Sequence, residues 1–325
     1  MFEILKSKTP KFKFYLDTKN QAILKSKFDS INNYNSFIQN KSELIKLTIN
    51  KIFKINDFKT IKEVIINLNI PNSNSNKDNY FMQVNPKTVS LDSVEVEVNL
   101  LAIFLENVSD DEIIKSLNHE FIHIEHMLYF KTLSNSIKIT EKVLNKIKEI
   151  SKQNTQIENI FDLRALITVL YTKTYIESIA IFFQEQRNPS LDNISKQYTN
   201  LEPIVVKLLE KLVPLIKQQE KYNFEDFLPF IKFINYLFGE FMVSNIYFIN
   251  PKITKQDLME LSHVKLFQLY EKSVEVINLK YNTKFRPLLS FNSQKGIIDY
   301  QFVLKALNHN FETLKLQLKN TWLLK

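Results

Sequence analysis

The sequence contains no cysteine and only two glycines, Gly239 and Gly296. Without cysteine the chain cannot form disulfides, thiolate metal sites or a cysteine nucleophile. Phosphate-binding loops and dinucleotide-binding fingerprints need several glycines, so the near absence of glycine excludes both. Binding and chemistry must therefore depend on histidines, carboxylates, amides and hydroxyl groups. Low glycine together with abundant lysine, isoleucine and leucine also indicates a mostly helical chain.

Long hydrophobic runs are also missing. The most apolar stretch, 227–248, is interrupted by four polar residues, Lys232, Asn235, Glu240 and Asn245. Residues 1–20 lack the continuous apolar core of a signal peptide. We therefore expect no transmembrane segment and a cytoplasmic protein, and the lack of cysteine fits a reducing compartment.

Positive charge is concentrated at one end of the chain. The net charge is +8, and residues 1–60 carry twelve lysines against five acidic residues, whereas the rest is close to neutral. The lysines are spread out rather than clustered. This spacing favours a solvated helical face, so we expect no nucleic-acid partner.

The pattern of apolar residues predicts an α+β fold that is predominantly α. Segment 64–70 is rich in β-branched residues, and Val94, Val96 and Val98 alternate with polar residues, which is typical of a half-exposed strand. After residue 105 the pattern is helical. We predict a basic helical N-terminal segment, a core with a small sheet and a helical C-terminal region. Their predicted ranges are 1–60, 61–188 and 189–325, with short strands at 80–84 and 88–91 and a polar loop at 71–79.

The most informative motif is the pentapeptide His119-Glu120-Phe121-Ile122-His123. Two imidazoles four residues apart on a helix project from the same face and can bind one zinc ion. Glu120, between them, is placed to take a proton from water at the metal. The chain has only five histidines, which makes this spacing informative.

The helix that carries the motif has a recognisable start. Ser109 and Glu112 have the spacing of a capping box, and we expect the helix to end near Phe130. At 100° per residue the histidines His119, His123 and His126 lie roughly opposite the apolar stripe. That stripe is expected to consist of Ile114, Leu117, Phe121, Ile124 and Leu128.

A hydrolytic zinc site needs a third protein ligand, which must come from another element. His126 shares the histidine face but lies too far along the axis, so we expect it to be exposed or to border the site. Glu177 is the preferred ligand, because a carboxylate in an apolar helix, predicted at 157–186, is costly unless it is paired or bound to metal. A salt bridge with Arg164 or Lys173 is the alternative. Other carboxylates that could replace Glu177 are Glu158, Asp162 and Glu185.

The segment from Asp111 to His123 resembles the active-site helix of the zincin metallopeptidases. Glu177, in Glu177-Ser178-Ile179-Ala180, is similar to the third ligand of the gluzincin branch, and the valine strand occupies the place of the zincin edge strand. The resemblance covers roughly residues 60–188. The chain departs from gluzincins at Asn118 and lacks an acid after Ala180, and the residues after His123 lack the metzincin glycine and third histidine.

This resemblance implies a zincin-like core and a zinc metallopeptidase that hydrolyses a peptide or protein substrate. Zn2+ would be bound by His119, His123 and Glu177, and Glu120 would act as the general base. A tyrosine or histidine would stabilise the transition state. Candidates for that role are Tyr171, Tyr175, His263 and His309.

Two other interpretations remain open. Glu120 and His123 form an E-x-x-H pair, Glu260 and His263 form a second, and a di-iron carboxylate helical protein uses two such pairs. His263 shares a helical face with apolar residues, which favours a core position for it instead. The other alternative is a non-catalytic helical interaction protein.

Overall fold

A computed structural model gives the fold of the chain. It describes residues 10–16, 21–56, 58, 60–69, 82–86, 92–130, 160–184, 188–216 and 234–289. The contacts divide the chain into two compact units, Met1–Leu128 and Tyr129–Lys325. The described part is mostly helical with one small four-stranded sheet, so the expectation of an α+β, predominantly α fold is confirmed.

The sheet belongs to the first unit. Its strands are β1 (Lys11–Leu16), β2 (Glu63–Asn69), β3 (Met82–Pro86) and β4 (Ser93–Asn99), in the order β1-β2-β4-β3. β1, β2 and β4 are parallel, whereas β3 runs antiparallel to β4 at one edge. The predicted strands at 64–70 and 94–98 are therefore present, and β3 corresponds to the strand predicted at 80–84. The predicted loop at 71–79 and the predicted strand at 88–91 lie outside the described residues.

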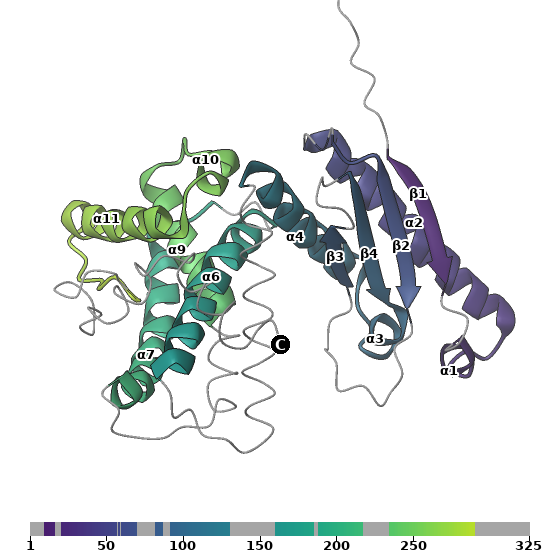
Figure 1. Cartoon of the computed structure of the whole chain (residues 1–325), viewed down its shortest axis with the longest axis horizontal. Helices are drawn as coiled ribbons and strands as arrows, with labels where there is room; N and C mark the ends of the chain where they lie inside the picture. The colour runs from purple at the N-terminus through teal and green to yellow at the C-terminus, as the bar shows by residue number, and fades with distance from the viewer. Residues whose placement is uncertain are drawn as a thin grey trace, which may run out of the picture. The chain divides into compact units, whose positions relative to one another are not determined.

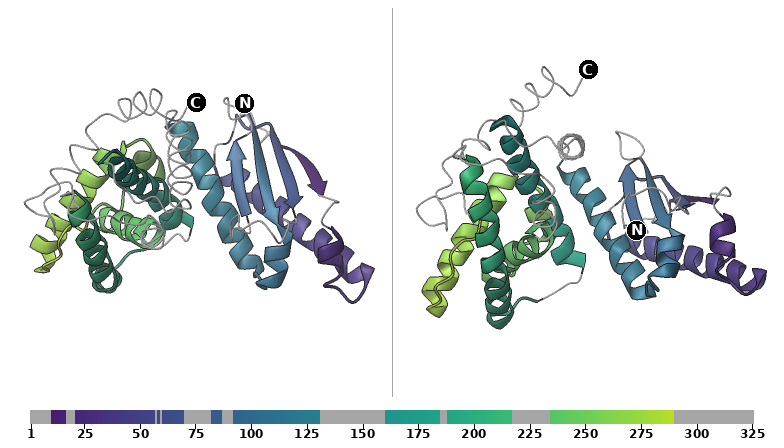
Figure 2. Two further views of the ribbon diagram at one scale, coloured as in Figure 1. Left: turned by 60° about the horizontal axis from the view of Figure 1, so that its bottom comes forward. Right: turned by 90° about the horizontal axis from the view of Figure 1, so that it is seen from below.

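The first unit also contains helices. They are α1 (Gln21–Lys25), α2 (Ile31–Ile55), α3 (Leu100–Leu105) and α4 (Asp110–Tyr129). Figures 1 and 2 show α2 across one face of the sheet and α4 beside β3. The rings of Phe53 and Phe58 each contact Phe121 of α4 at 5.7 Å between centroids. Burial of Phe58, Phe121 and the strand valines stabilises the packing of α4 against the sheet.

Two details of this unit differ from the expectation. The N-terminal segment 1–60 is not helical throughout, because β1 pairs with β2 in parallel register. β4 is also less exposed than its alternating sequence predicts, since Glu95 is buried and accepts a hydrogen bond from the amide of Asn67. Cross-strand pairing satisfies this carboxylate, which sequence periodicity cannot indicate.

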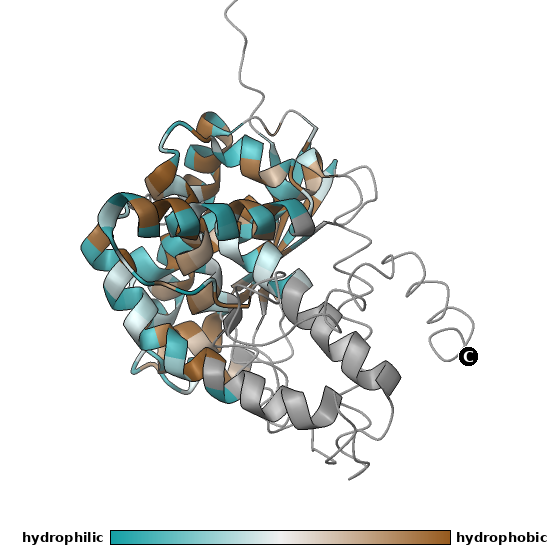
Figure 3. Ribbon diagram, turned by 90° about the vertical axis from the view of Figure 1, so that its left-hand side faces the viewer, coloured by the Kyte–Doolittle hydropathy of each residue, from teal (hydrophilic) through white to brown (hydrophobic). Residues whose placement is uncertain are grey.

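The described residues of the second unit form helices and the loops between them. It contains α6 (Ile160–Gln184), α7 (Leu191–Ile216), a π-helix η2 (Ile234–Phe238), α9 (Gly239–Ile249), α10 (Lys255–Met259) and α11 (His263–Tyr281). α9 packs against α6, α7 and α11, and its residues 239–246 are all buried. A helix that is buried on every side must be apolar on every side, and α9 meets this condition except at Glu240, Ser244 and Asn245. In Figure 3 both hydrophobic and hydrophilic residues occur along the helices that are coloured by hydropathy.

A proline inside a helix removes a backbone hydrogen bond and usually ends or kinks the helix. Pro203 and Pro214 instead lie inside α7. Pro251 follows α9 and Pro287 follows α11, as expected for residues that end helices. None of the helices that the structure describes has the length and hydropathy needed to cross a membrane. The domain boundaries and the cytoplasmic location predicted from the sequence stay predictions.

Candidate metal centre

The helix that carries the motif begins where the sequence predicts. The backbone N–H of Ser109 donates to the carboxylate of Glu112 at 2.8 Å, and the N–H of Glu112 donates to Oγ of Ser109 at 3.2 Å. The bonds that the N–H and the hydroxyl of Ser109 donate to the Glu112 carboxylate lower the pKa of Glu112. The capping box is therefore formed, and it fixes the first turn of α4. The last residue of α4, Tyr129, lies one position before Phe130, where the sequence predicts the end of the helix.

One face of α4 is buried, as its amphipathic pattern predicts. Leu117, Phe121 and Ile124 are almost completely inaccessible to solvent. Ile113 is buried in place of the predicted Ile114, and the predicted Leu128 is only half-buried. The stripe is therefore rotated slightly from the ideal period at both ends of the helix, while its centre follows the prediction.

The two motif histidines face each other on the partly exposed side of α4. Their Nε2 atoms are 3.0 Å apart, and their rings are perpendicular with centroids 4.6 Å apart. Two nitrogens bound to the same tetrahedral zinc at 2.0–2.1 Å are roughly 3.3 Å apart. The two nitrogens are thus already close to the separation at which they could bind one ion.

Glu120 is held in place by the edge strand. Its Oε2 atom accepts a hydrogen bond of 3.2 Å from the backbone N–H of Val84 in β3. Val84 pairs with Val96 of β4, so the sheet fixes the position of this donor. The carboxylate that was predicted to be the general base is therefore oriented beside the histidine pair by a backbone group.

Glu177 lies in the middle of α6, and only 8% of its surface is exposed. His119 and His123 belong to the first compact unit, and Glu177 belongs to the second. These three residues were named from the sequence as the ligand set. Two imidazole nitrogens and one carboxylate oxygen form a donor set that suits zinc and leaves a fourth position open.

The position of α6 depends on small residues next to Glu177. A Cβ atom built on Gly239 would lie 2.9 Å from Cα of Ser178 and 3.0 Å from its Cβ. The backbones of α6 and α9 therefore approach closely at this point, and glycine is required because any side chain would collide with backbone. The neighbouring Ser178 and Ala180 are completely buried, as their small size suggests.

His126 was expected to be exposed or to border the site. It is completely buried, neither exposed nor part of the ligand group. Glu125 and Met127, its neighbours on α4, are buried as well. The other carboxylates considered were Glu158 and Glu185, which lie outside the described residues, and Asp162, which lies in α6 but whose side chain is not described.

The residues considered for transition-state stabilisation have different settings. The hydroxyl of Tyr175 donates to the backbone carbonyl of Leu261 at 2.6 Å, and burial raises its pKa. Its proton is therefore engaged in holding the loop before α11. His263 begins α11 and lies 6.3 Å from the Tyr175 ring. Tyr171 lies in α6 without a described side chain, and His309 lies outside the described residues.

The second E-x-x-H pair is not arranged as a di-iron site requires. Glu260 is exposed and follows α10, whereas His263 is the first residue of α11. The carboxylate of Glu260 accepts a hydrogen bond from the Gln256 amide at 2.9 Å. Di-iron bundles project both members of such a pair inward from one helix, and these two residues do not share a helix.

The contact between Val84 and Glu120 had no signal in the sequence. A backbone N–H is the same in every residue but proline, and the position of the Val84 N–H beside Glu120 depends on the pairing of β3 with β4.

Comparison with protein-family models, with curated proteins and with solved structures gives no match to this chain. The function must therefore be argued from the geometry of the site itself.

Proposed function

We propose that this chain is a zinc-dependent metallopeptidase, in which His119, His123 and Glu177 bind Zn2+ and Glu120 is the general base. The proposal rests mainly on the histidine pair of α4, whose Nε2 atoms lie 3.0 Å apart next to a carboxylate held by β3. A zincin-like core of the chain, with β3 as its edge strand, is part of this proposal. The antiparallel edge position of β3 and the burial of Glu177 support it.

The chain's own residues divide the work of hydrolysis. Zinc held by these residues would supply Lewis acidity, which would polarise a carbonyl group and lower the pKa of bound water to ~7. Glu120 accepts the proton of the attacking water and passes it to the leaving amine. The bond from Val84 keeps this carboxylate in one orientation, which lowers the entropic cost of the proton transfer. Burial of Glu177 favours its binding to a cation, because an unpaired carboxylate is costly there.

The first test is metal content. The purified chain is expected to contain one zinc per molecule by inductively coupled plasma mass spectrometry. Two irons per molecule would instead support the di-iron carboxylate hypothesis. No bound metal after incubation with zinc would overturn both this hypothesis and the zinc metallopeptidase.

Replacement of the general base is the sharpest test of catalysis. Glu120→Gln is expected to retain zinc and to lower hydrolysis of a quenched fluorescent peptide library by about 100-fold to 10,000-fold, because the amide cannot accept a proton. Asp111→Asn, an exposed change at the start of the same helix, is the matched control and should leave the rate unchanged. Equal rates for wild type and Glu120→Gln would show that Glu120 is not the base.

Replacement of the third ligand tests the site separately from catalysis. Glu177→Gln is expected to weaken zinc binding by more than the ~10–100-fold that loss of a residue supporting a ligand costs. Competition with a chromogenic chelator measures this affinity without any substrate. Glu260→Gln is the control, since Glu260 is exposed. An unchanged zinc affinity in Glu177→Gln would mean that the third ligand is another residue.

A further inference from the structure

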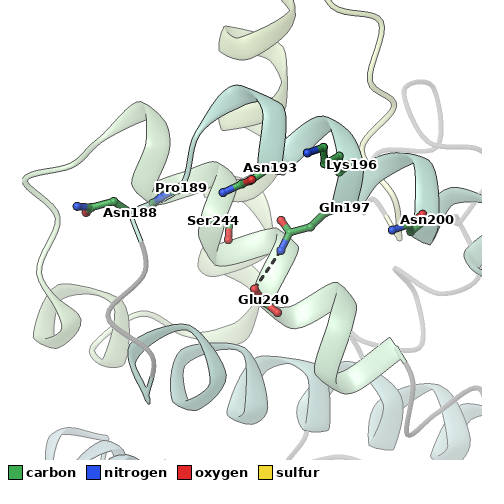
Figure 4. Close-up of a pocket in the computed structure, with 8 residues that line it drawn as sticks. All are labelled: Asn188, Pro189, Asn193, Lys196, Gln197, Asn200, Glu240 and Ser244. Atoms are coloured by element: carbon green, nitrogen blue, oxygen red, sulfur yellow. Dashed lines mark hydrogen bonds between the residues drawn. The ribbon is translucent and has the colours of Figure 1, made fainter.

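A polar hollow lies in the helical unit. It has a volume of about 360 Å3 and is formed between α7 and α9 (Figure 4). On α7 the residues at positions 193, 196, 197 and 200 follow the helical period and therefore share one face. On α9, Glu240 and Ser244 are one turn apart and face the hollow. It is lined by Asn188, Pro189, Asn193, Lys196, Gln197, Asn200, Glu240 and Ser244.

The inner end of this hollow carries hydrogen-bond acceptors. Glu240 is only 7% exposed, and its carboxylate accepts a bond of 3.0 Å from Nε2 of Gln197. A carboxylate accepts rather than donates, so this bond fixes which end of the Gln197 amide is nitrogen. The amide oxygen Oε1 is buried and has no hydrogen-bond partner among the residues that the structure describes. A buried acceptor without a donor is unfavourable, and a bound donor would satisfy it.

The outer end of the hollow has the opposite character. Lys196, Asn193 and Asn200 are exposed residues of α7 that line it. Figure 4 shows Gln197 reaching from α7 toward Glu240, with Ser244 beside it on α9. The hollow therefore combines a buried carboxylate and an amide oxygen with an exposed ammonium group. Its volume is at the small end of the range for ligand pockets, about 300–1,000 Å3.

We propose that this hollow binds a small zwitterion, a free α-amino acid or a dipeptide. The ligand's ammonium group donates to the carboxylate of Glu240 and to Oε1 of Gln197, and its carboxylate pairs with Lys196. An ammonium group has three donors and so matches two acceptors and the Ser244 hydroxyl. Bonds between charged partners of this kind are the stronger class, which makes both ends of the ligand necessary. The proposal is independent of the metal centre.

Calorimetric titration of the full chain tests this site with four probes. Alanine and alanyl-alanine carry both charges, alanine methyl ester lacks the anion, and N-acetylalanine lacks the cation. We expect alanine or alanyl-alanine to bind, and each blocked probe to bind about 10-fold more weakly or worse. The affinities of alanine and alanyl-alanine, compared with each other, show whether the site prefers the free amino acid or the dipeptide.

Variants locate the binding. Glu240→Gln and Lys196→Met are expected to weaken the zwitterion about 10-fold, while Lys207→Met, an exposed lysine on the same helix that does not line the hollow, should not. His119→Ala should also bind normally, which separates this site from zinc chelation. Heat denaturation of each variant checks that it is folded. Absence of binding by both zwitterions, or binding that Glu240→Gln and Lys196→Met leave unchanged while they stay folded, would overturn the proposal.

Discussion

At the scale of single residues, His263 makes the folded state sensitive to acid. Burial lowers its pKa below the ordinary value of 6.5, and its place at the start of α11 also disfavours a cation. In the unfolded chain the imidazole takes up a proton as the pH falls through about 6.5. The folded chain takes it up only at lower pH. The free energy of unfolding therefore decreases below about pH 6.5 by at most about 1.4 kcal/mol per pH unit from this group.

The variant His263→Gln is expected to show a weaker loss of stability between pH 7.5 and pH 5. Urea unfolding in the presence of a chelator measures this, because the chelator removes any contribution from zinc that His119 and His123 would bind. A pH dependence identical in wild type and variant would contradict the assignment to His263. The folded state favours the neutral imidazole of His263, so protonation at low pH lowers the free energy of unfolding.

Single residues also show where the sequence is informative about the site. The histidine spacing and the capping box depend on residues within one helix, so they could be read directly. The burial of His126 and the bond from Val84 to Glu120 depend on what packs against that helix. Helical periodicity gives a direction around the axis, but it cannot say how many neighbouring elements cover each face.

At the scale of secondary structure elements, the contact between α6 and α9 is the most constrained. In Gly239→Ala the new methyl group would lie 2.9 Å from Cα of Ser178, a backbone atom that can move only if a helix shifts. Alanine gains up to about 1 kcal/mol over glycine in helix propensity, whereas overpacking costs about 1–3 kcal/mol. The overpacking outweighs the gain, so we expect net destabilisation by about 1–2 kcal/mol.

Chemical denaturation followed by circular dichroism measures this difference. Lys207→Ala, a change at an exposed position of α7, is the control and should stay within about 0.5 kcal/mol of wild type. A Gly239→Ala variant as stable as the control would mean that the helices can separate here without cost. Since Ser178 follows Glu177 directly, the same shift is expected to weaken zinc binding.

The elements differ in how well the sequence predicts them. β2, β4 and α4 have strong local patterns, and each was located to within a residue or two. β1 was missed because its lysines alternate with aromatic residues in a segment whose overall charge suggests a solvated helix; pairing with β2 stabilises it instead. α7 continues through Pro203 and Pro214, where tertiary packing outweighs the local cost of proline.

At the scale of the whole molecule, two compact units make unfolding a composite process. A ligand that binds only the folded protein raises its stability by about 2.7 kcal/mol at a free concentration of 100 times the dissociation constant. Zinc at that concentration is therefore expected to raise the midpoint of thermal unfolding by several degrees, and a chelator should reverse the shift. Magnesium should cause no shift, because it prefers oxygen ligands in octahedral geometry and the proposed donors include two imidazoles.

The comparison of variants connects this thermal shift to the proposed ligands. In His123→Ala the zinc-dependent rise should be lost, since one ring nitrogen remains on α4 where two are needed. In Glu120→Gln the rise should be retained, since the proposed base is not a ligand. Differential scanning calorimetry of the wild type and both variants, each with and without zinc at equal protein concentration, measures this rise. A rise that persists in His123→Ala would place the ion at another site, and a rise lost in Glu120→Gln would make Glu120 a ligand rather than a base.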